Sequence, residues 1–116
     1  MGGYEGLVVW QRGMQFVAEC YRISRAFPRS EQFGLTTQLR RAAVSLPANV
    51  AEGNGRWYRK EYLHHLSIAR GSVKEAETFL RIAVMLGYVS EEGVGEALRL
   101  SDECSRMLTT MRRRLS

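Results

Sequence analysis

Residues 35–53 limit the fold of this chain more than any other segment, because they form an amphipathic helix that contains a proline. Apolar residues recur there at steps of three and four, which places them on one helical face. They are Leu35, Leu39, Ala42, Leu46 and Val50. Pro47 lacks an amide hydrogen, and its ring clashes with the carbonyl of Ala43. The pattern therefore predicts a helix that bends at Pro47.

The opposite face of the same helix carries small and polar residues. They are Arg41, Ser45, Ala48 and Glu52. Asn49 lies between the two faces, where we expect its side chain to bond the carbonyl that Pro47 leaves free. The many small side chains predict that another helix backbone approaches closely.

Three further segments have helical periodicity, and no segment alternates in the manner of a strand. We expect helices over residues 5–26, 31–51, 59–86 and 90–115. Ser30 is the expected cap of the second helix, and the glycines at 53 and 55 are expected to end it, with a glycine in the left-handed conformation. Short connections between four helices predict an all-α fold, an antiparallel up-down four-helix bundle formed as one domain by residues 1–116.

The apolar stripes of the other three helices predict the rest of the core. The first helix presents Leu7, Trp10, Met14, Val17 and Tyr21. The third presents Tyr62, Leu66, Ala69, Val73, Ala76, Leu80 and Ala83. The fourth presents Val94, Ala97, Ser101, Cys104, Leu108, Met111 and Leu115. Cys20 and Cys104 lack metal-ligand or redox spacing, so we expect buried thiols.

The third helix has a second apolar face beside its core stripe. This face consists of Ile68, Phe79, Ile82 and Leu86. A helix that is apolar on two sides is normally covered on both. We therefore expect a subunit interface in a homo-oligomer, with coverage by the chain's own loops as the alternative.

The chain offers few residues in catalytic or metal-binding arrangements. Glu61-x-x-His64 has the spacing of a di-iron ligand pair, but the only other histidine is His65 and no second pair exists. No nucleophile stands beside a base, and no glycine-rich loop follows a strand. We expect no enzyme activity, no cofactor and no metal. The apolar runs are too short for a signal peptide or a membrane helix, so we expect a cytoplasmic protein.

Basic residues give a stronger indication of function. The net charge is +5 and the pI about 9.7, and residues 27–88 hold nine basic and five acidic side chains. We expect nucleic-acid contacts from Arg40, Arg41, Arg56, Trp57, Arg59, Lys60 and Arg70. Trp57 and Tyr58 either stack on bases or cover the end of the bundle. The fourth helix is neutral overall, and Arg112-Arg113-Arg114 reads equally well as a solvated tail.

The segment from Leu35 to Gly53 resembles the signature of the bacterial four-helix-bundle proteins, also called 23S rRNA intervening-sequence proteins. The resemblance continues through Phe27-Pro28, residues 66–72 and residues 86–88. It implies a four-helix bundle that assembles as a homopentamer, and a relationship to the accessory protein of diversity-generating retroelements, which binds a reverse transcriptase through a basic surface. The positions that match the family's basic motif are Arg40, Arg41 and Arg70. Those that match its structural motif are Ser45, Pro47, Asn49, Glu52 and Gly53.

Two functions are consistent with these features. In the first, a non-catalytic homopentameric bundle presents a basic surface to RNA, DNA or a ribonucleoprotein partner. In the second, the bundle is a protein-interaction scaffold that makes no direct contact with nucleic acid.

Overall fold

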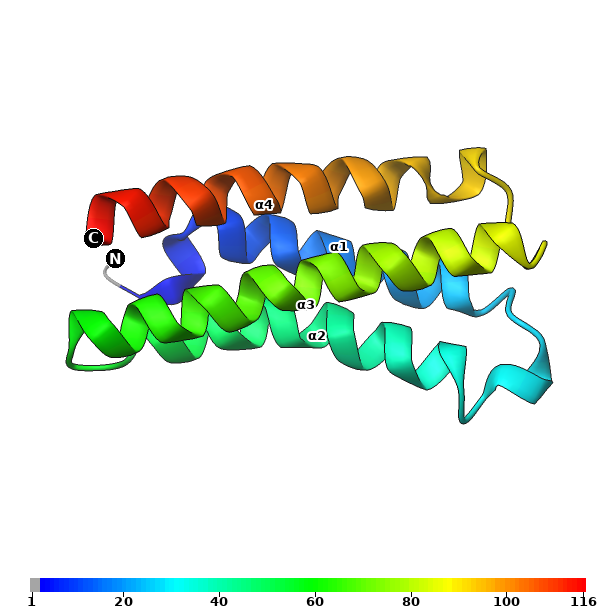
Figure 1. Ribbon diagram of the computed structural model, residues 1–116, viewed down its shortest axis with the longest axis horizontal. Coiled ribbons are helices and arrows are strands. Elements are labelled where there is room, and N and C mark those ends of the chain that lie inside the picture. The colour runs from blue at the N-terminus through cyan, green and yellow to red at the C-terminus, as the bar shows by residue number, and fades with distance from the viewer. Residues whose placement is uncertain (1–2) are drawn as a thin grey trace.

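Four long helices make up most of the computed structural model, which describes residues 3–116 (Figure 1). They are α1 (Val8–Ser24), α2 (Leu35–Asn54), α3 (Arg59–Met85) and α4 (Gly95–Leu115). Three short 3-10 helices accompany them: η1 (Tyr4–Gly6), η2 (Arg29–Glu31) and η3 (Glu92–Val94). No strand occurs within residues 3–116. The predicted all-α class and its four helices are therefore confirmed.

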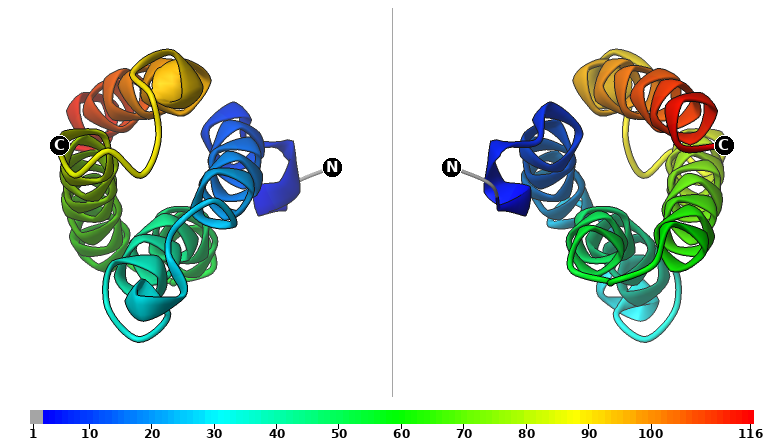
Figure 2. Two further views of the ribbon diagram at one scale, coloured as in Figure 1. Left: turned by 90° about the vertical axis from the view of Figure 1, so that its right-hand side faces the viewer. Right: turned by 90° about the vertical axis from the view of Figure 1, so that its left-hand side faces the viewer.

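The four helices lie along one long axis, in a body of 43 × 25 × 23 Å. Seen from either end, they occupy the corners of a square, with α1 beside α2, α2 beside α3, α3 beside α4 and α4 beside α1 (Figure 2). In Figure 1 the chain runs from left to right along α1 and α3 and returns along α2 and α4. This arrangement is consistent with a four-helix bundle.

The bundle encloses one apolar core to which every long helix contributes. Its largest fully buried apolar side chains include Phe16, Leu39, Leu46, Leu66, Leu80, Leu100 and Leu108. All five residues of the predicted α2 stripe are buried, as are most of the α3 and α4 stripes. Both cysteines are free and buried, and burial raises the pKa of each thiol to about 12. The expectation of buried thiols is confirmed.

The predicted core stripe of α1 is confirmed only in part, because Leu7, Trp10 and Val17 are partly buried against the core whereas Met14 and Tyr21 are exposed. Residues of a neighbouring face are buried instead: Val9, Gly13, Phe16, Cys20 and Ile23. Met14 is 47% exposed and Tyr21 36%. Gly13 explains the rotation, because a Cβ there would lie 3.3 Å from Cγ of Leu46 and 3.4 Å from Cβ of Pro47. The face with no side chain at this point is the one that can pack against α2.

Helix α2 begins at Leu35, four residues later than predicted, and Ser30 does not cap it. Its first turn is capped by Glu31, whose Oε1 accepts a hydrogen bond from the Leu35 amide at 3.0 Å. The other carboxylate oxygen accepts a bond from the Tyr88 hydroxyl at 2.8 Å, beyond the end of α3. These two bonds, the Leu35 one foremost, hold the pKa of Glu31 below its usual value.

The carboxyl ends of α2 and α3 differ. Gly53 lies inside α2, and among the described residues only Gly87 has a positive φ, 79°. At Gly87 the chain leaves α3, with the Tyr88 amide bonded to the Ala83 carbonyl at 2.9 Å and the Gly87 amide to Val84 at 3.0 Å. This pattern of two hydrogen bonds requires a residue in the left-handed conformation, which glycine adopts without strain. The predicted end of α3 is confirmed, whereas the left-handed cap of α2 is wrong.

Helix α2 continues through Pro47, which is buried. The bend at this residue stays a prediction. None of the helices described between residues 3 and 116 combines the length and apolar character needed to span a membrane.

Glu31 predicts a pH-dependent contribution to stability. A carboxylate whose pKa is lower in the folded chain stabilises the fold above its unfolded pKa, and this contribution disappears as the pH falls through the folded pKa. We expect Glu31→Gln to lower the free energy of unfolding at pH 7, and the difference from the native chain to vanish as the pH falls through the folded pKa of Glu31. Urea unfolding across this range measures it.

Glu92→Gln is the matched control, because the Glu92 side chain makes no hydrogen bond or ion pair among residues 3–116. If the loss of unfolding free energy in Glu31→Gln were the same in acid as at pH 7, the carboxylate charge would contribute nothing to stability at this position.

Candidate nucleic-acid interface

The residues predicted to contact nucleic acid are distributed over three sides and one end of the bundle. Arg40 faces α1, where its Nε donates a hydrogen bond to the Ser24 hydroxyl at 2.8 Å. Its guanidinium carbon lies 4.5 Å from the centre of the Tyr21 ring. A cation over an aromatic face is attracted by the ring. Arg40 therefore joins α1 to α2, and this contact occupies the side chain.

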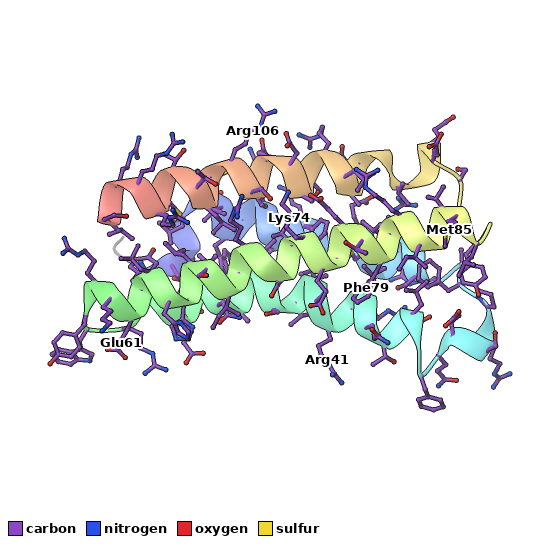
Figure 3. All side chains as sticks on the ribbon, viewed as in Figure 1. Arg41, Glu61, Lys74, Phe79, Met85 and Arg106 are labelled. Atoms are coloured by element: carbon purple, nitrogen blue, oxygen red, sulfur yellow. The ribbon has the colours of Figure 1, made fainter. Side chains whose placement is uncertain are left out.

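Arg41 lies on the side of α2 away from the core and points out of the bundle (Figure 3). It lines a shallow groove of about 330 Å³ between α2 and α3, together with Thr37, Glu75 and Phe79. Consecutive residues of a helix point about 100° apart, so Arg40 and Arg41 cannot serve the same surface.

At the turn between α2 and α3, Arg56 already has two carboxylate partners. Its guanidinium lies 2.5 Å from Glu52 and 3.6 Å from Glu61. The bond from Arg56, with a smaller contribution from His65, holds the pKa of Glu52 below its usual value. These pairs are exposed and therefore weak, but they occupy the Arg56 guanidinium at this turn.

The aromatic residues of the same turn project into solvent. Trp57 is 93% exposed and Tyr58 71%. In this chain they do not cover the end of the bundle, so the interpretation of these rings as a cover is wrong. Arg59 and Lys60 follow in the first turn of α3, and both are exposed.

Arg70 lies on the opposite side of α3 from the Arg41 groove, where it meets basic residues of α4. It lines one groove of about 250 Å³ with Lys74 and Arg112, and a second of about 380 Å³ with Arg106 and Arg113. Lys74 reaches from α3 toward α4, and Arg106 points outward from α4 (Figure 3). We call these five residues the α3–α4 basic face.

Three of these five cations have no acidic partner. Among residues 3–116, no carboxylate lies within ion-pair distance of Arg70, Arg112 or Arg113. Lys74 lies 3.7 Å from Glu77, and Arg106 lies 3.0 Å from Asp102. Exposed pairs of this kind are weak. The α3–α4 basic face therefore keeps most of its positive charge.

Sequence reasoning missed the contribution of α4 because the predicted fourth helix, residues 90–115, is neutral overall. All five acids of that segment lie at or before residue 103, whereas Arg112, Arg113 and Arg114 lie at its end. The spacing of the basic residues along each helix could have indicated this face. Arg70 and Lys74 are four residues apart and Arg106 and Arg113 seven, so each pair shares a helical face.

Two residues of the structural motif, Ser45 and Asn49, take part in a line of hydrogen bonds between α2 and α3. The hydroxyl oxygens of Ser45 and Ser72 lie 2.8 Å apart. Asn49 donates to the Ser45 hydroxyl at 3.0 Å, and its Oδ1 accepts from Nδ1 of His65 at 2.9 Å. We call these four residues the α2–α3 polar seam. It continues to Glu52, which lies 3.9 Å from Nε2 of His65.

The predicted partner of Asn49 was wrong. Its amide donates to the Ser45 carbonyl at 2.9 Å, four residues earlier, and not to the Ala43 carbonyl that Pro47 leaves free. Asn49 lies on the side of α2 that faces α3, whereas Pro47 packs toward Gly13 of α1. The two residues therefore serve different helix contacts.

Gly53 lies at the end of the polar seam, where α2 and α3 approach each other closely. A Cβ there would lie 2.8 Å from Cβ of His65 and 3.0 Å from Cδ1 of Tyr62. The motif glycine is required by this close approach.

Comparison with known proteins agrees with this geometry. The model of the 23S rRNA-intervening sequence protein family matches residues 5–110. This chain belongs to that family. Among solved structures it is similar to a protein with unknown function from the S23 ribosomal protein family of Bacteroides thetaiotaomicron VPI-5482. The TM-score is 0.83 at 20% identity, over 90% of this chain and 97% of that one, which shows a shared fold. A search of the curated proteins finds no match.

The second apolar face of α3, which sequence analysis assigns to a subunit interface, is partly open in this family member. Ile68 is 38% exposed and Leu86 49%, while Phe79 and Ile82 are half-buried against the core. Three more apolar side chains are exposed: Phe33 (89%), Met85 (74%) and Val44 (42%). Assembly through this face stays a prediction, as does the relationship to retroelement accessory proteins.

The residues considered as metal ligands lie at the start of α3. The ring centres of His64 and His65 are 5.6 Å apart, and His65 is committed to the polar seam. Within residues 3–116, no three histidine, cysteine, aspartate or glutamate side chains gather in a metal-binding cluster.

Alanine substitutions at two glycines should change the free energy of unfolding in opposite directions. Gly53→Ala forces α2 and α3 apart, and we expect it to lower the free energy of unfolding by about 1–3 kcal/mol. Gly71→Ala is the control, because a Cβ at this exposed helical position meets nothing within 4 Å. Alanine there favours the helix by about 0.5–1 kcal/mol. Denaturant unfolding of both variants measures the contrast, and equal effects at the two sites would contradict it.

Proposed function

We propose that this 23S rRNA-intervening sequence family member is a non-catalytic, cytoplasmic bundle that binds nucleic acid or a ribonucleoprotein partner through its α3–α4 basic face. The observation that carries the proposal is the gathering of Arg70, Arg112 and Arg113 on one side of the bundle without acidic partners in the described chain. Phosphate contacts by such residues supply most of the sequence-independent affinity for nucleic acid.

Arginine is well suited to this surface. Its planar guanidinium presents several donors in a fixed fork that matches a phosphate group. Arg70 belongs to both grooves of the basic face, so it lies between the two α4 arginines. Two or more phosphates of a backbone can then be contacted along α3 and α4.

The turn between α2 and α3 extends the proposed surface. In Figure 1, α3 begins at the same end of the bundle at which α4 finishes. Arg59 and Lys60 therefore lie toward the end that carries Arg112 and Arg113. The exposed Trp57 beside them offers a face on which an unpaired base can stack. This combination favours single-stranded or looped nucleic acid.

Assembly through the second apolar face of α3 is compatible with this surface. Ile68 and Leu86 are eighteen residues apart, which is five complete turns at 3.6 residues per turn, so they share one side of the helix. Arg70 points about 160° away from Ile68, since two residues span 200°. A homo-oligomer, for which we propose a pentamer, would bury the apolar face and leave the basic face of each copy exposed.

The alternative function is a protein-interaction scaffold with no direct nucleic-acid contact. The pairing of Arg56 with Glu52 and Glu61 and the structural role of Arg40 favour it, because they remove two cations from the sequence-predicted patch. Treatment with nuclease separates the two functions, since a partner held through nucleic acid is released.

The test is binding of labelled single-stranded RNA and of duplex DNA over a range of salt concentrations. We expect affinity to fall steeply with salt, and Arg70→Gln combined with Arg112→Gln to weaken binding and reduce the logarithmic salt slope. Each lost phosphate contact lowers the slope by about 0.7 for single strands and 0.9 for duplex.

Arg99→Gln is the control on α4, because Arg99 is paired with Glu96 at 2.7 Å and lies thirteen residues before Arg112, about 20 Å along the helix. Binding that is indifferent to salt, or equally weakened by the control, would contradict the proposal.

A further inference from the structure

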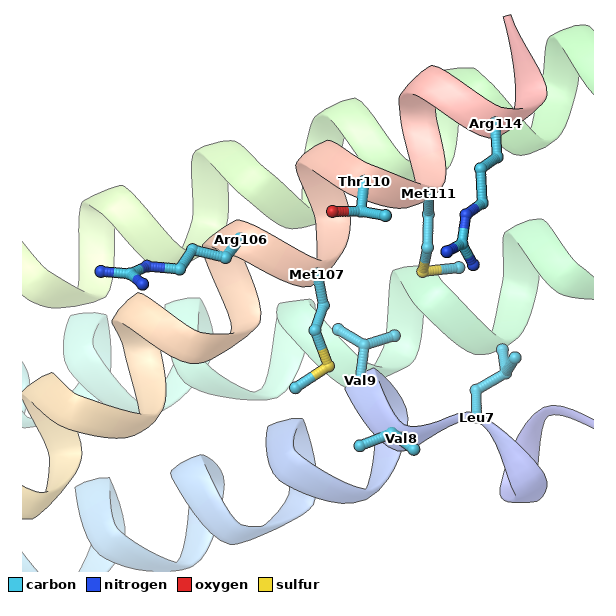
Figure 4. Close-up of a pocket in the computed structure, with 8 residues that line it drawn as sticks. All are labelled: Leu7, Val8, Val9, Arg106, Met107, Thr110, Met111 and Arg114. Atoms are coloured by element: carbon cyan, nitrogen blue, oxygen red, sulfur yellow. The ribbon is translucent and has the colours of Figure 1, made fainter.

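A further groove lies between α1 and α4 and has a different character from the basic face. It has a volume of about 360 Å³. Leu7 and Val8, at the start of α1, form one wall, and Met107 and Met111 of α4 form the other (Figure 4). The groove lies near the end of the bundle that holds both the start of α1 and the end of α4 (Figure 1).

The lining of this groove is apolar and adaptable. Val8 is 51% exposed, although it is a large aliphatic side chain. Met107 and Met111 are half-buried, and their side chains point from α4 toward α1 (Figure 4). Methionine side chains are flexible and polarisable, and they are frequent at surfaces that receive a partner's apolar side chains.

An arginine stands at each end of the groove. Arg106 and Arg114 both line it, and they are eight residues apart, or about 12 Å along α4 at 1.5 Å per residue. Arg114 has no carboxylate within ion-pair distance among residues 3–116. Arg106 pairs with Asp102, but their side chains are 81% and 62% exposed, so the pair is weak.

We propose that this groove binds an acidic amphipathic helix of a partner protein. Such a helix places two apolar side chains over Met107 and Met111, and two carboxylates about two turns apart at Arg106 and Arg114. An apolar floor with cations at both ends complements this pattern. A nucleic-acid backbone has no apolar face to offer the floor. The inference goes beyond the proposed function, because its ligand is acidic protein and its surface lies on the α1 side of α4, where it shares only Arg106 with the α3–α4 basic face.

The space suits an anchor of this size. Complete small-molecule sites begin at about 300 Å³, so 360 Å³ is enough for a few side chains of a helix that otherwise lies on the surface. Affinity would come from the buried apolar anchors, and the arginines would select acidic sequences over neutral ones.

The experiment uses two helical peptides of about 16 residues with the full-length protein. In the first, two glutamates stand eight residues apart, with leucines at the facing positions between them. In the second, both glutamates are glutamine. We expect the acidic peptide to bind about five- to tenfold more tightly than the neutral one, in line with two exposed ion pairs. Fluorescence anisotropy of labelled peptide measures the two affinities.

Arg114→Gln should weaken the acidic peptide by about two- to fivefold and leave the neutral peptide unchanged. Methyl NMR of the native protein locates the peptide without any substitution, through shifts of the Met107 and Met111 signals that spare Met85 at the far end of the bundle. Arg70→Gln combined with Arg112→Gln should not change peptide affinity, which separates this groove from the basic face even if nucleic acid does not bind.

Several results would overturn the inference. They are equal binding of the two peptides, no binding of either, and methyl shifts outside the groove. A loss of peptide affinity in the Arg70→Gln, Arg112→Gln variant as large as the loss in Arg114→Gln would overturn it too. Light scattering adds one more: self-association that Val8→Lys abolishes would show that a second copy of the chain occupies the groove.

Discussion

The α2–α3 polar seam is the contact on which the rest of this structure depends. Side chains of Ser45, Asn49, His65 and Ser72 satisfy one another between two helices whose other facing residues are small or apolar. Ser72 is buried and the other three residues are partly buried. Polar groups withdrawn from water are costly when unpaired, so a slip of either helix along the other is disfavoured. Gly53 adds a steric requirement at one end, since only the missing Cβ lets α3 come this close. Together they fix the register and the separation of α2 and α3.

Fixing α3 in this way decides what its remaining sides present. Its apolar second face, with Ile68 and Leu86, points outward beside α2. Its basic side, with Arg70 and Lys74, meets α4. The motif shared with the 23S rRNA-intervening sequence family therefore acts on the surface indirectly. Most motif residues make internal contacts, and they determine where the functional side chains lie.

The buried face of a helix could be predicted from the sequence where the helix has only one apolar face. The stripe of α2, from Leu35 to Val50, was predicted in full because its opposite face is small and polar. The stripe of α1 was not, because Phe16 and Trp10 belong to neighbouring apolar faces. Gly13 decided between them through a contact with Leu46 and Pro47 on another helix. The cap of α2 was missed for a similar reason. Glu31 lies four residues before the amide of Leu35 that it caps, and its other partner, Tyr88, is remote in sequence.

The candidate site was harder to predict for a related reason. Whether a cation is available depends on what its side chain reaches, and this is a tertiary property. Arg40 finds Ser24 and Tyr21 on α1, and Arg56 finds Glu52 and Glu61 at the turn. Arg112 and Arg113, which the sequence allows to be a solvated tail, line grooves with Arg70 because α4 packs against α3. The composition predicts that the surface is positively charged, but helix packing determines which arginines are available and on which face they lie.

A double-mutant cycle on the polar seam tests this account most directly. Asn49→Ala, His65→Ala and the double variant are unfolded with denaturant, and their free energies are combined. If the seam holds α2 and α3 in register, the two substitutions should be coupled by about 1 kcal/mol or more. Effects that add to within about 0.3 kcal/mol would contradict it, because the two side chains would then contribute independently.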